Sequence, residues 1–269
     1  MPATSRQTIG AIGFLAVAIG FVILHVILAH NFVNVTWLSG LVLFALLCLL
    51  MLFGVRKRLP TLPLLPASLW LKAHTYVGLL ALVVFFAHNG LSIPFGTLEQ
   101  CLAAFFLCTG LSGIIGLILS RIIPARLTAA GENLNFERIP VLCQQLRKEV
   151  EALVLESAEA TSSTTIADFY QANLSTYFSK PLFLLGTWLE RKSKRVNLIE
   201  RLEGLKRYLN AEEEKIAEEL IGMIATKQNL DAQWSLQGVL KLWLFVHIPL
   251  SFGLFVLALA HIALVWKFI

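Results

Sequence analysis

Six histidines are the residues of this chain whose type and spacing are best suited to chemistry. All of them lie in or at the ends of apolar segments: His25, His30, His74, His88, His247 and His261. An ionisable side chain inside a bilayer is costly, so each histidine needs a partner or a function. A hydrogen bond between helices explains a lone histidine. Two pairs with one spacing require more, because 14 residues separate His74 from His88 and His247 from His261.

The 14-residue spacing places both histidines of a pair on nearly one face of a helix. At about 100° and 1.5 Å per residue, 14 steps return to within about 40° of the starting direction and cover about 21 Å. Each helix therefore presents one imidazole near each membrane leaflet. Because one spanning segment separates the two helices, they run in the same direction. We expect His74 to lie level with His247 near the cytoplasmic face, and His88 with His261 near the outer face.

Two imidazoles that face each other suit the two axial positions of a noncovalent heme iron, because iron accepts a neutral ring nitrogen while the other nitrogen donates a hydrogen bond. Zinc requires three or four ligands at one point, whereas each level offers two. The cysteines at 48, 101, 108 and 143 form no Cys-x-x-Cys or Cys-x-x-Cys-His motif, which excludes iron–sulfur runs and covalent heme attachment. The sequence predicts two b-type hemes with four metal ligands: His74, His88, His247 and His261.

The pattern His74-x13-His88 with His247-x13-His261 on like-directed helices resembles the diheme core of membrane cytochromes b. The respiratory bc-type cytochrome b has this pattern, and the transmembrane core of ferric reductases and NADPH oxidases has a close variant. Use of the third and fifth spanning segments is more similar to the reductase core. The Pro-Glu-Trp-Tyr motif of the bc-type quinol site does not occur in the sequence. The resemblance covers the third to fifth segments and implies electron transfer across a membrane.

The elements that must position these histidines are membrane-spanning helices. The 269 residues are 57% hydrophobic and 14% charged, and mean hydropathy is +0.74, whereas a soluble domain carries about 25% charged residues. This composition excludes secreted disulfide scaffolds and ordinary cytosolic enzymes. A spanning helix needs about 20 apolar residues, and five segments qualify: Ile9–Ala29, Trp37–Val55, Ser68–His88, Leu98–Ser120 and Leu236–Trp266. We expect an all-α bundle of five transmembrane helices, four within residues 1–120 and the fifth within 236–269.

The charges separate residues 121–235 from the rest of the chain. This insertion holds 15 basic and 16 acidic residues, net −1, whereas the remainder holds seven basic residues and one acid, Glu99. The excess positive charge therefore belongs to membrane flanks, and we expect no nucleic-acid partner. Apolar residues in the insertion recur at steps of three or four, which predicts a soluble α-helical domain.

Two amphipathic helices are expected within the insertion. The first includes Ile139 to Leu153, and the second is a coiled-coil-like seam from Leu198 to Leu230 that Glu212 interrupts. The polar stretch Thr161–Thr165 predicts a linker after the first helix. The segment Pro181–Arg195 combines apolar and basic residues, which suits either an anionic membrane surface or a buried helix with a solvated end.

The short loops predict the orientation in the membrane. Arg6 precedes the first span, Arg56-Lys57-Arg58 lies between the second and third, and Arg121 and Arg126 follow the fourth. Loops 30–36 and 89–97 contain neither Lys nor Arg. The positive-inside rule then puts the N-terminus and residues 121–235 in the cytoplasm and the C-terminus outside. We expect an integral protein of a bacterial cytoplasmic (inner) membrane.

Further residues are candidates for binding the cofactor. Gly78, one turn after His74, offers space for close approach of a macrocycle. Heme propionates need cations near the surface, and the candidates at the cytoplasmic level are Lys72, Lys241 and Arg121. The alternative for the glycine is small-residue helix packing, and the alternative for the cations is membrane anchoring. His25 and His30 are candidates for a quinone or proton site, although interfacial histidines also occur without such a role.

Two classes of function follow from these residues. The first is an electron-transfer subunit of a larger, quinone-linked redox complex, rather than a stand-alone enzyme, with partner subunits docking on the cytoplasmic insertion. The hemes would carry the redox chemistry. The alternative is a non-redox membrane scaffold or transporter that uses its histidines for metal or proton handling. Acidic residues within the spans would favour that alternative, and Glu99 alone is near such a position.

Overall fold

The computed structural model describes residues 3–31, 34–58, 66–90, 92, 94–129, 134–161, 163–179 and 197–268, and the regular elements in these ranges are helices. The chain divides into two units. The first comprises Met1–Leu117 and Leu244–Ile269, and the second comprises Ile118–Trp243. Five helices of the described part are long and apolar enough to cross a membrane. The expectation of an all-α protein with five spanning helices is thereby confirmed.

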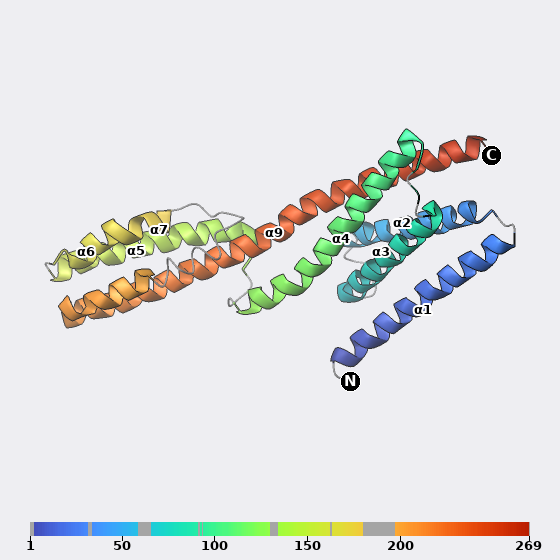
Figure 1. The fold of residues 1–269 in the computed structure, drawn as a ribbon. Coiled ribbons are helices and arrows are strands. Elements are labelled where there is room, and N and C mark those ends of the chain that lie inside the picture. Colours follow the sequence, from blue (N-terminus) through green and yellow to red (C-terminus); the bar gives the residue numbers. More distant parts are fainter. Residues whose placement is uncertain are drawn as a thin grey trace. The chain divides into compact units, whose positions relative to one another are not determined.

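The first unit contains α1 (Ala3–His30), α2 (Val35–Arg58), α3 (Ala67–Asn89), most of α4 (Thr97–Ala129) and the last part of α9 (Ala211–Phe268) (Figure 1). In the most apolar window of each candidate span, only 6% to 17% of the residues are buried inside the protein. Helices that are apolar on all sides and expose those sides require a lipid environment. These helices therefore make the chain an integral membrane protein.

The core of the first unit lies between the two predicted histidine levels. It combines residues of α2, α3, α4 and α9: Leu46, Leu47, Ala81, Val84, Phe85, Phe106, Leu254 and Ala258. Ala81 is midway between the two histidines of α3, and Leu254 is midway between those of α9. Phe85 stacks on Phe106 with ring centroids 4.1 Å apart. Apolar contacts thus hold α3 and α9 in one core at the level midway between the histidines of each helix.

The end of α3 places His88 at the membrane boundary. Gly90 follows the helix with φ of 59°, a left-handed conformation that favours glycine, and its N–H donates to the carbonyl of Phe86. This cap ends the helix at Asn89. His88 therefore lies in the last turn of α3.

The second unit is a helical bundle in which α5 (Ile139–Thr161) runs antiparallel to the first part of α9 (Figure 1). The N–H of Leu134, which precedes α5, donates to Gln233 Oε1 at 3.0 Å, and Gln237 Nε2 donates to the Leu134 carbonyl at 2.9 Å. Further elements cover the core: η1 (Phe136–Arg138), α6 (Thr165–Phe169), the π-helix η2 (Tyr170–Leu174), α7 (Ser175–Ser179), a helix over 197–205, and η3 (Lys206–Tyr208). Helices between the fourth and fifth spans were expected, and the structure confirms them.

The seam from Leu198 to Leu230 is not one helix, because the helical structure ends at η3 and a new helix, α9, begins at Ala211. Asn210 Oδ1 accepts hydrogen bonds from the N–H groups of Glu212 and Glu213 at 3.0 and 2.9 Å, and Glu213 Oε2 accepts from the Asn210 N–H at 2.9 Å. This reciprocal arrangement is a capping box, which starts a new helix. From there α9 continues for 58 residues, so the predicted fifth span begins inside a helix. The segment 181–195 lies outside the described residues.

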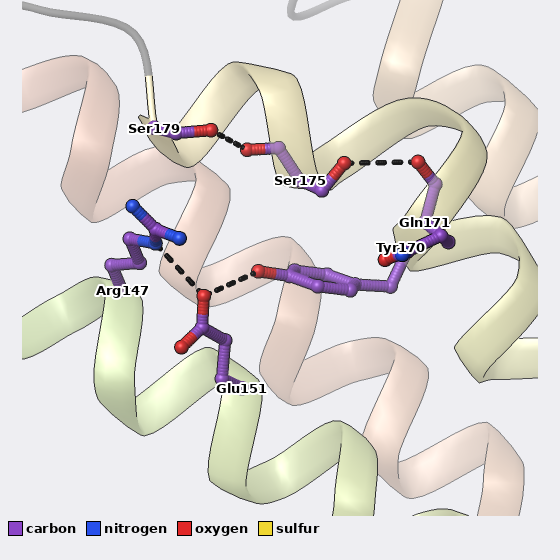
Figure 2. A network of polar contacts seen from close by, with 6 residues as sticks. All are labelled: Arg147, Glu151, Tyr170, Gln171, Ser175 and Ser179. Carbon is purple, nitrogen blue, oxygen red and sulfur yellow. Dashed lines mark hydrogen bonds and ion pairs between the residues drawn. The ribbon is translucent and has the colours of Figure 1, made fainter.

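Polar contacts connect α5 to the π-helical turn (Figure 2). Glu151 Oε1 accepts from Arg147 Nε at 2.8 Å and from the Tyr170 hydroxyl at 3.3 Å. The guanidinium lowers the pKa of Glu151, whereas burial raises the pKa of Tyr170. Beyond the turn, the Ser175 hydroxyl donates to the Gln171 carbonyl at 2.9 Å, and the Ser179 hydroxyl donates to the Ser175 carbonyl. The bond from Tyr170 to Glu151 thus connects the π-helical turn to α5, whereas the two serine bonds lie within the short helices.

Candidate functional site

His88 of α3 is held by the start of α2. Its Nδ1 lies 3.0 Å from the Thr36 carbonyl oxygen and 3.1 Å from Ser39 Oγ. Ser39 is 2% exposed, and its hydroxyl donates to the same carbonyl at 3.0 Å. Because a carbonyl only accepts, the hydrogen bond to Thr36 requires a proton on Nδ1. The lone pair of the neutral ring is then on Nε2, which is the tautomer that binds a metal while Nδ1 donates to a second group.

Gly40 allows the His88 ring to lie against the backbone of α2. A Cβ at this position would approach His88 Cε1 to 3.0 Å, closer than nearly all real Cβ contacts. The absence of a side chain at residue 40 therefore lets Ser39 and the imidazole meet. In this region α2 and α3 pack side by side (Figure 1).

His247 of α9 has the same kind of support from α4. Its Nδ1 lies 3.2 Å from Ser112 Oγ, and a Cβ at Gly113 would lie 3.8 Å from His247 Cε1. Ser112 is buried. A serine hydroxyl at Nδ1 and a glycine beneath Cε1 thus occur at one histidine of each predicted level.

These supporting residues were missed by the sequence reasoning, although a signal for them exists. The tripeptide Leu-Ser-Gly occurs as Leu38-Ser39-Gly40 in the second span and as Leu111-Ser112-Gly113 in the fourth. A polar residue next to glycine, repeated in two apolar segments, indicates a buried hydrogen bond between closely packed helices. The sequence alone does not say which side chain receives it.

The two other predicted ligands have different neighbours. The ring of His74 lies against Phe53 of α2, with centroids 4.9 Å apart. His261 Nδ1 lies 3.7 Å from Glu99 Oε1 of α4. His261 and His25 both lie within electrostatic range of His88. One histidine of α9 and one of α1 thus belong to the electrostatic surroundings of His88.

Of the other candidates, two are exposed and two lie beside protein groups. A Cβ at Gly78 would lie at an ordinary van der Waals distance of 3.9 Å from Leu50 Cδ2, and Lys72 is exposed on α3. Within the second unit, Arg121 is exposed, and Lys241 Nζ lies 2.9 Å from Glu137 Oε1.

Lys241 also lies over an aromatic ring, with Nζ 4.1 Å from the centroid of Phe136. Its hydrogen bond and positive charge lower the pKa of Glu137. The ammonium of Lys241 therefore already has an anionic partner and a cation–π contact within its own unit.

Among the described residues, no group of three or more His, Cys, Asp or Glu side chains is arranged to hold a metal ion. That finding is compatible with an iron that takes only two protein ligands. Comparison of the chain with protein-family models, with curated proteins and with solved structures returned no match. The fold and its five long apolar helices define a multi-span helical membrane protein.

Proposed function

We propose that the protein carries electrons across the membrane through two noncovalent b-type hemes, one bound by His74 and His247 and the other by His88 and His261. The observation that carries this proposal is the repeated support of one histidine at each level. Ser39 with Gly40 and Ser112 with Gly113 hold His88 and His247 through Nδ1. A histidine with a purely structural role between helices would require neither the same Ser-Gly support at a second histidine nor another histidine 14 residues along its own helix.

The donor set fits the proposed cofactor. A heme iron requires a neutral imidazole with its lone pair on the ligating nitrogen, and the hydrogen bond from His88 to the Thr36 carbonyl produces that state at Nε2. Hydrogen bonds at Nδ1 also fix the plane of the ring and raise the basicity of the ligand. When bound, the hemes would accept and donate single electrons. The protein would orient the ligands and exclude water from the spanning region.

The remaining candidate site residues are part of the same proposal. Lys72 and Arg121, together with Lys241 where Glu137 leaves it available, would pair with heme propionates at the cytoplasmic level. Gly78 would leave room for the macrocycle. A quinone near His25 at the outer level is a further candidate ligand, because His25 lies within electrostatic range of His88.

The protein would act as a subunit of a redox complex in a bacterial inner membrane. Residues 121–235 would lie in the cytoplasm and present the docking surface for a partner subunit. The long α9 supports this role, because one helix carries both core residues of the insertion and two of the proposed ligands. Replacement of 127–230 by a flexible linker should keep both hemes and abolish electron exchange with the cytoplasmic partner. Unchanged turnover in native membranes would exclude docking on the insertion.

The proposal is tested by the heme content of the purified chain. Pyridine-hemochrome analysis and a reduced-minus-oxidised spectrum should give two b-type hemes per chain. His74→Ala and His247→Ala should each remove one heme and leave the outer one, whereas His88→Ala and His261→Ala should leave the inner one. His30→Ala is the matched control, because His30 ends α1 outside both pairs, and it should retain two hemes. A folded, heme-free wild-type protein, or four variants that all keep two hemes, would reject the proposal.

A further inference from the structure

The outer end of α9 has an acidic neighbour that the proposed function does not use. Glu99 Oε1 lies 3.7 Å from His261 Nδ1, with 43% of the Glu99 side chain and 22% of the His261 side chain exposed. Outside residues 121–235, Glu99 is the one acidic residue of the sequence. A carboxylate at the end of an apolar span is costly unless it meets a cation or a hydrogen-bond donor. The His261 ring lies 3.7 Å away, beyond hydrogen-bond distance, so its contact with the carboxylate is electrostatic.

Gly96 provides the space for this carboxylate. A Cβ built at Gly96 would overlap Glu99 Oε2, so a larger residue there would displace the acid. Gly96 directly precedes α4, and its carbonyl accepts a hydrogen bond from the N–H of Gln100 at 2.9 Å. The carboxylate is thus folded back over the start of the helix while its other oxygen faces His261.

The partner of His261 differs in charge from the partners of the other histidines. His88 meets a carbonyl and a hydroxyl, and His247 meets a hydroxyl, and these groups are neutral. A carboxylate 3.7 Å from Nδ1 adds negative charge close to the imidazole. This charge stabilises the ferric state over the ferrous state, which has one positive charge less.

We propose that Glu99 is a positioning residue for His261 that lowers the reduction potential of the outer-level heme relative to the inner one. This inference rests on the proposed function. Loops 30–36 and 89–97 contain no Lys or Arg, so no basic loop residue offsets the carboxylate. At the inner level the flanking loops are basic, which favours the ferrous state there. The two effects act in the same direction and separate the two potentials.

The test is a spectroscopic redox titration of both hemes in the purified full-length chain. Glu99→Gln, which keeps the shape and removes the charge, should shift the equilibrium of the outer heme about tenfold towards the reduced form, or about 59 mV for one electron. The inner heme is the internal control and should not shift. Glu99→Asp should restore part of the difference. Gly96→Ala keeps the net charge but displaces the carboxylate, and it should produce a smaller shift of the same sign.

Each outcome decides between the two proposals. Two hemes with a shift confined to the outer one support the role of Glu99, and a changed electron paramagnetic resonance signal of the ferric outer heme would accompany it. Two hemes with both potentials unchanged in Glu99→Gln would overturn that role and leave the proposed function intact. If the wild-type chain does not bind two hemes, the proposed function itself fails. Should Glu99→Gln not fold, the same reading applies to Gly96→Ala.

Discussion

Lys227 and Asp231 form an ion pair inside the second unit, and removal of one partner should strongly destabilise that unit. The Lys227 ammonium lies 2.5 Å from Asp231 Oδ1, and the two side chains are 1% and 5% exposed. On a helix surface, a lysine four residues before an acid is the less favourable order. The pair is therefore not explained by helix stabilisation alone. Its contribution depends on burial, because each charge has lost water and gained the other.

The expected cost follows from that burial. Lys227→Met keeps most of the aliphatic stem but leaves the Asp231 carboxylate buried without the ammonium. Breaking a buried pair in this way costs about 3–5 kcal/mol, which lowers the melting temperature of a unit of this size by about 10–20 °C. Lys227→Met combined with Asp231→Leu removes both charges. We expect the double variant to lie within about 1 kcal/mol of the wild type, because both buried charges are then removed together.

Thermal unfolding of the full chain in detergent, followed by circular dichroism at 222 nm, measures these differences. Lys206→Met is the matched control, because Lys206 also pairs with a carboxylate. Its Nζ lies 3.0 Å from Glu218 Oε1, and the two side chains are 25% and 64% exposed. Exposed pairs contribute little, so this control should melt with the wild type. The reasoning fails if Lys227→Met melts with the wild type, or if the double variant is less stable than Lys227→Met.

Three further predictions address the site, the insertion and the topology. Gly40→Val should force the His88 ring from its place and reduce the heme content from two per chain to one, whereas Gly54→Val on the same helix, where a Cβ meets no atom within 4 Å, should keep both. The Ser163 hydroxyl and the Asn210 N–H lower the pKa of Glu213 from 4.5. The ionised Glu213 carboxylate thus stabilises the insertion at pH values above its ordinary pKa, and this stabilisation is lost as the pH falls through the lowered pKa. Between about pH 5 and pH 3, the melting temperature should fall more steeply for the wild type than for Glu213→Gln. At neutral pH, Glu213→Gln should lower the free energy of unfolding by about 1 kcal/mol. A cysteine at Tyr208, which is 75% exposed, in a chain whose native cysteines are replaced by serine, should react with an impermeant maleimide in inverted vesicles. Labelling in intact cells would reverse the predicted orientation.

Much of the architecture was predictable because it depends on local properties of the chain. The expected span Ser68–His88 appears as Ser68–Asn89, since length and hydropathy alone decide whether a helix can cross a bilayer. The first helix of the insertion was equally readable from its apolar spacing and appears as Ile139–Thr161. The break before Ala211 was missed, although Asn210 and Glu213 have the spacing of a capping box. The apolar seam continues across that break, and periodicity alone does not reveal it.

By itself, the sequence determined the membrane class, the five spans and the two histidines on each of two helices, because the rise and turn of a helix convert sequence spacing directly into height and direction. Only the tertiary structure decided what each imidazole meets. Ser39 is 49 residues from His88, and Ser112 is 135 residues from His247. Hydrogen bonds over such separations depend on which helices pack together and at which height, and that packing is set by the apolar core as a whole. The position of the Glu99 carboxylate beside His261 is decided in the same way, because the two residues lie on α4 and α9, far apart in the sequence, and only the packing of these helices brings them together.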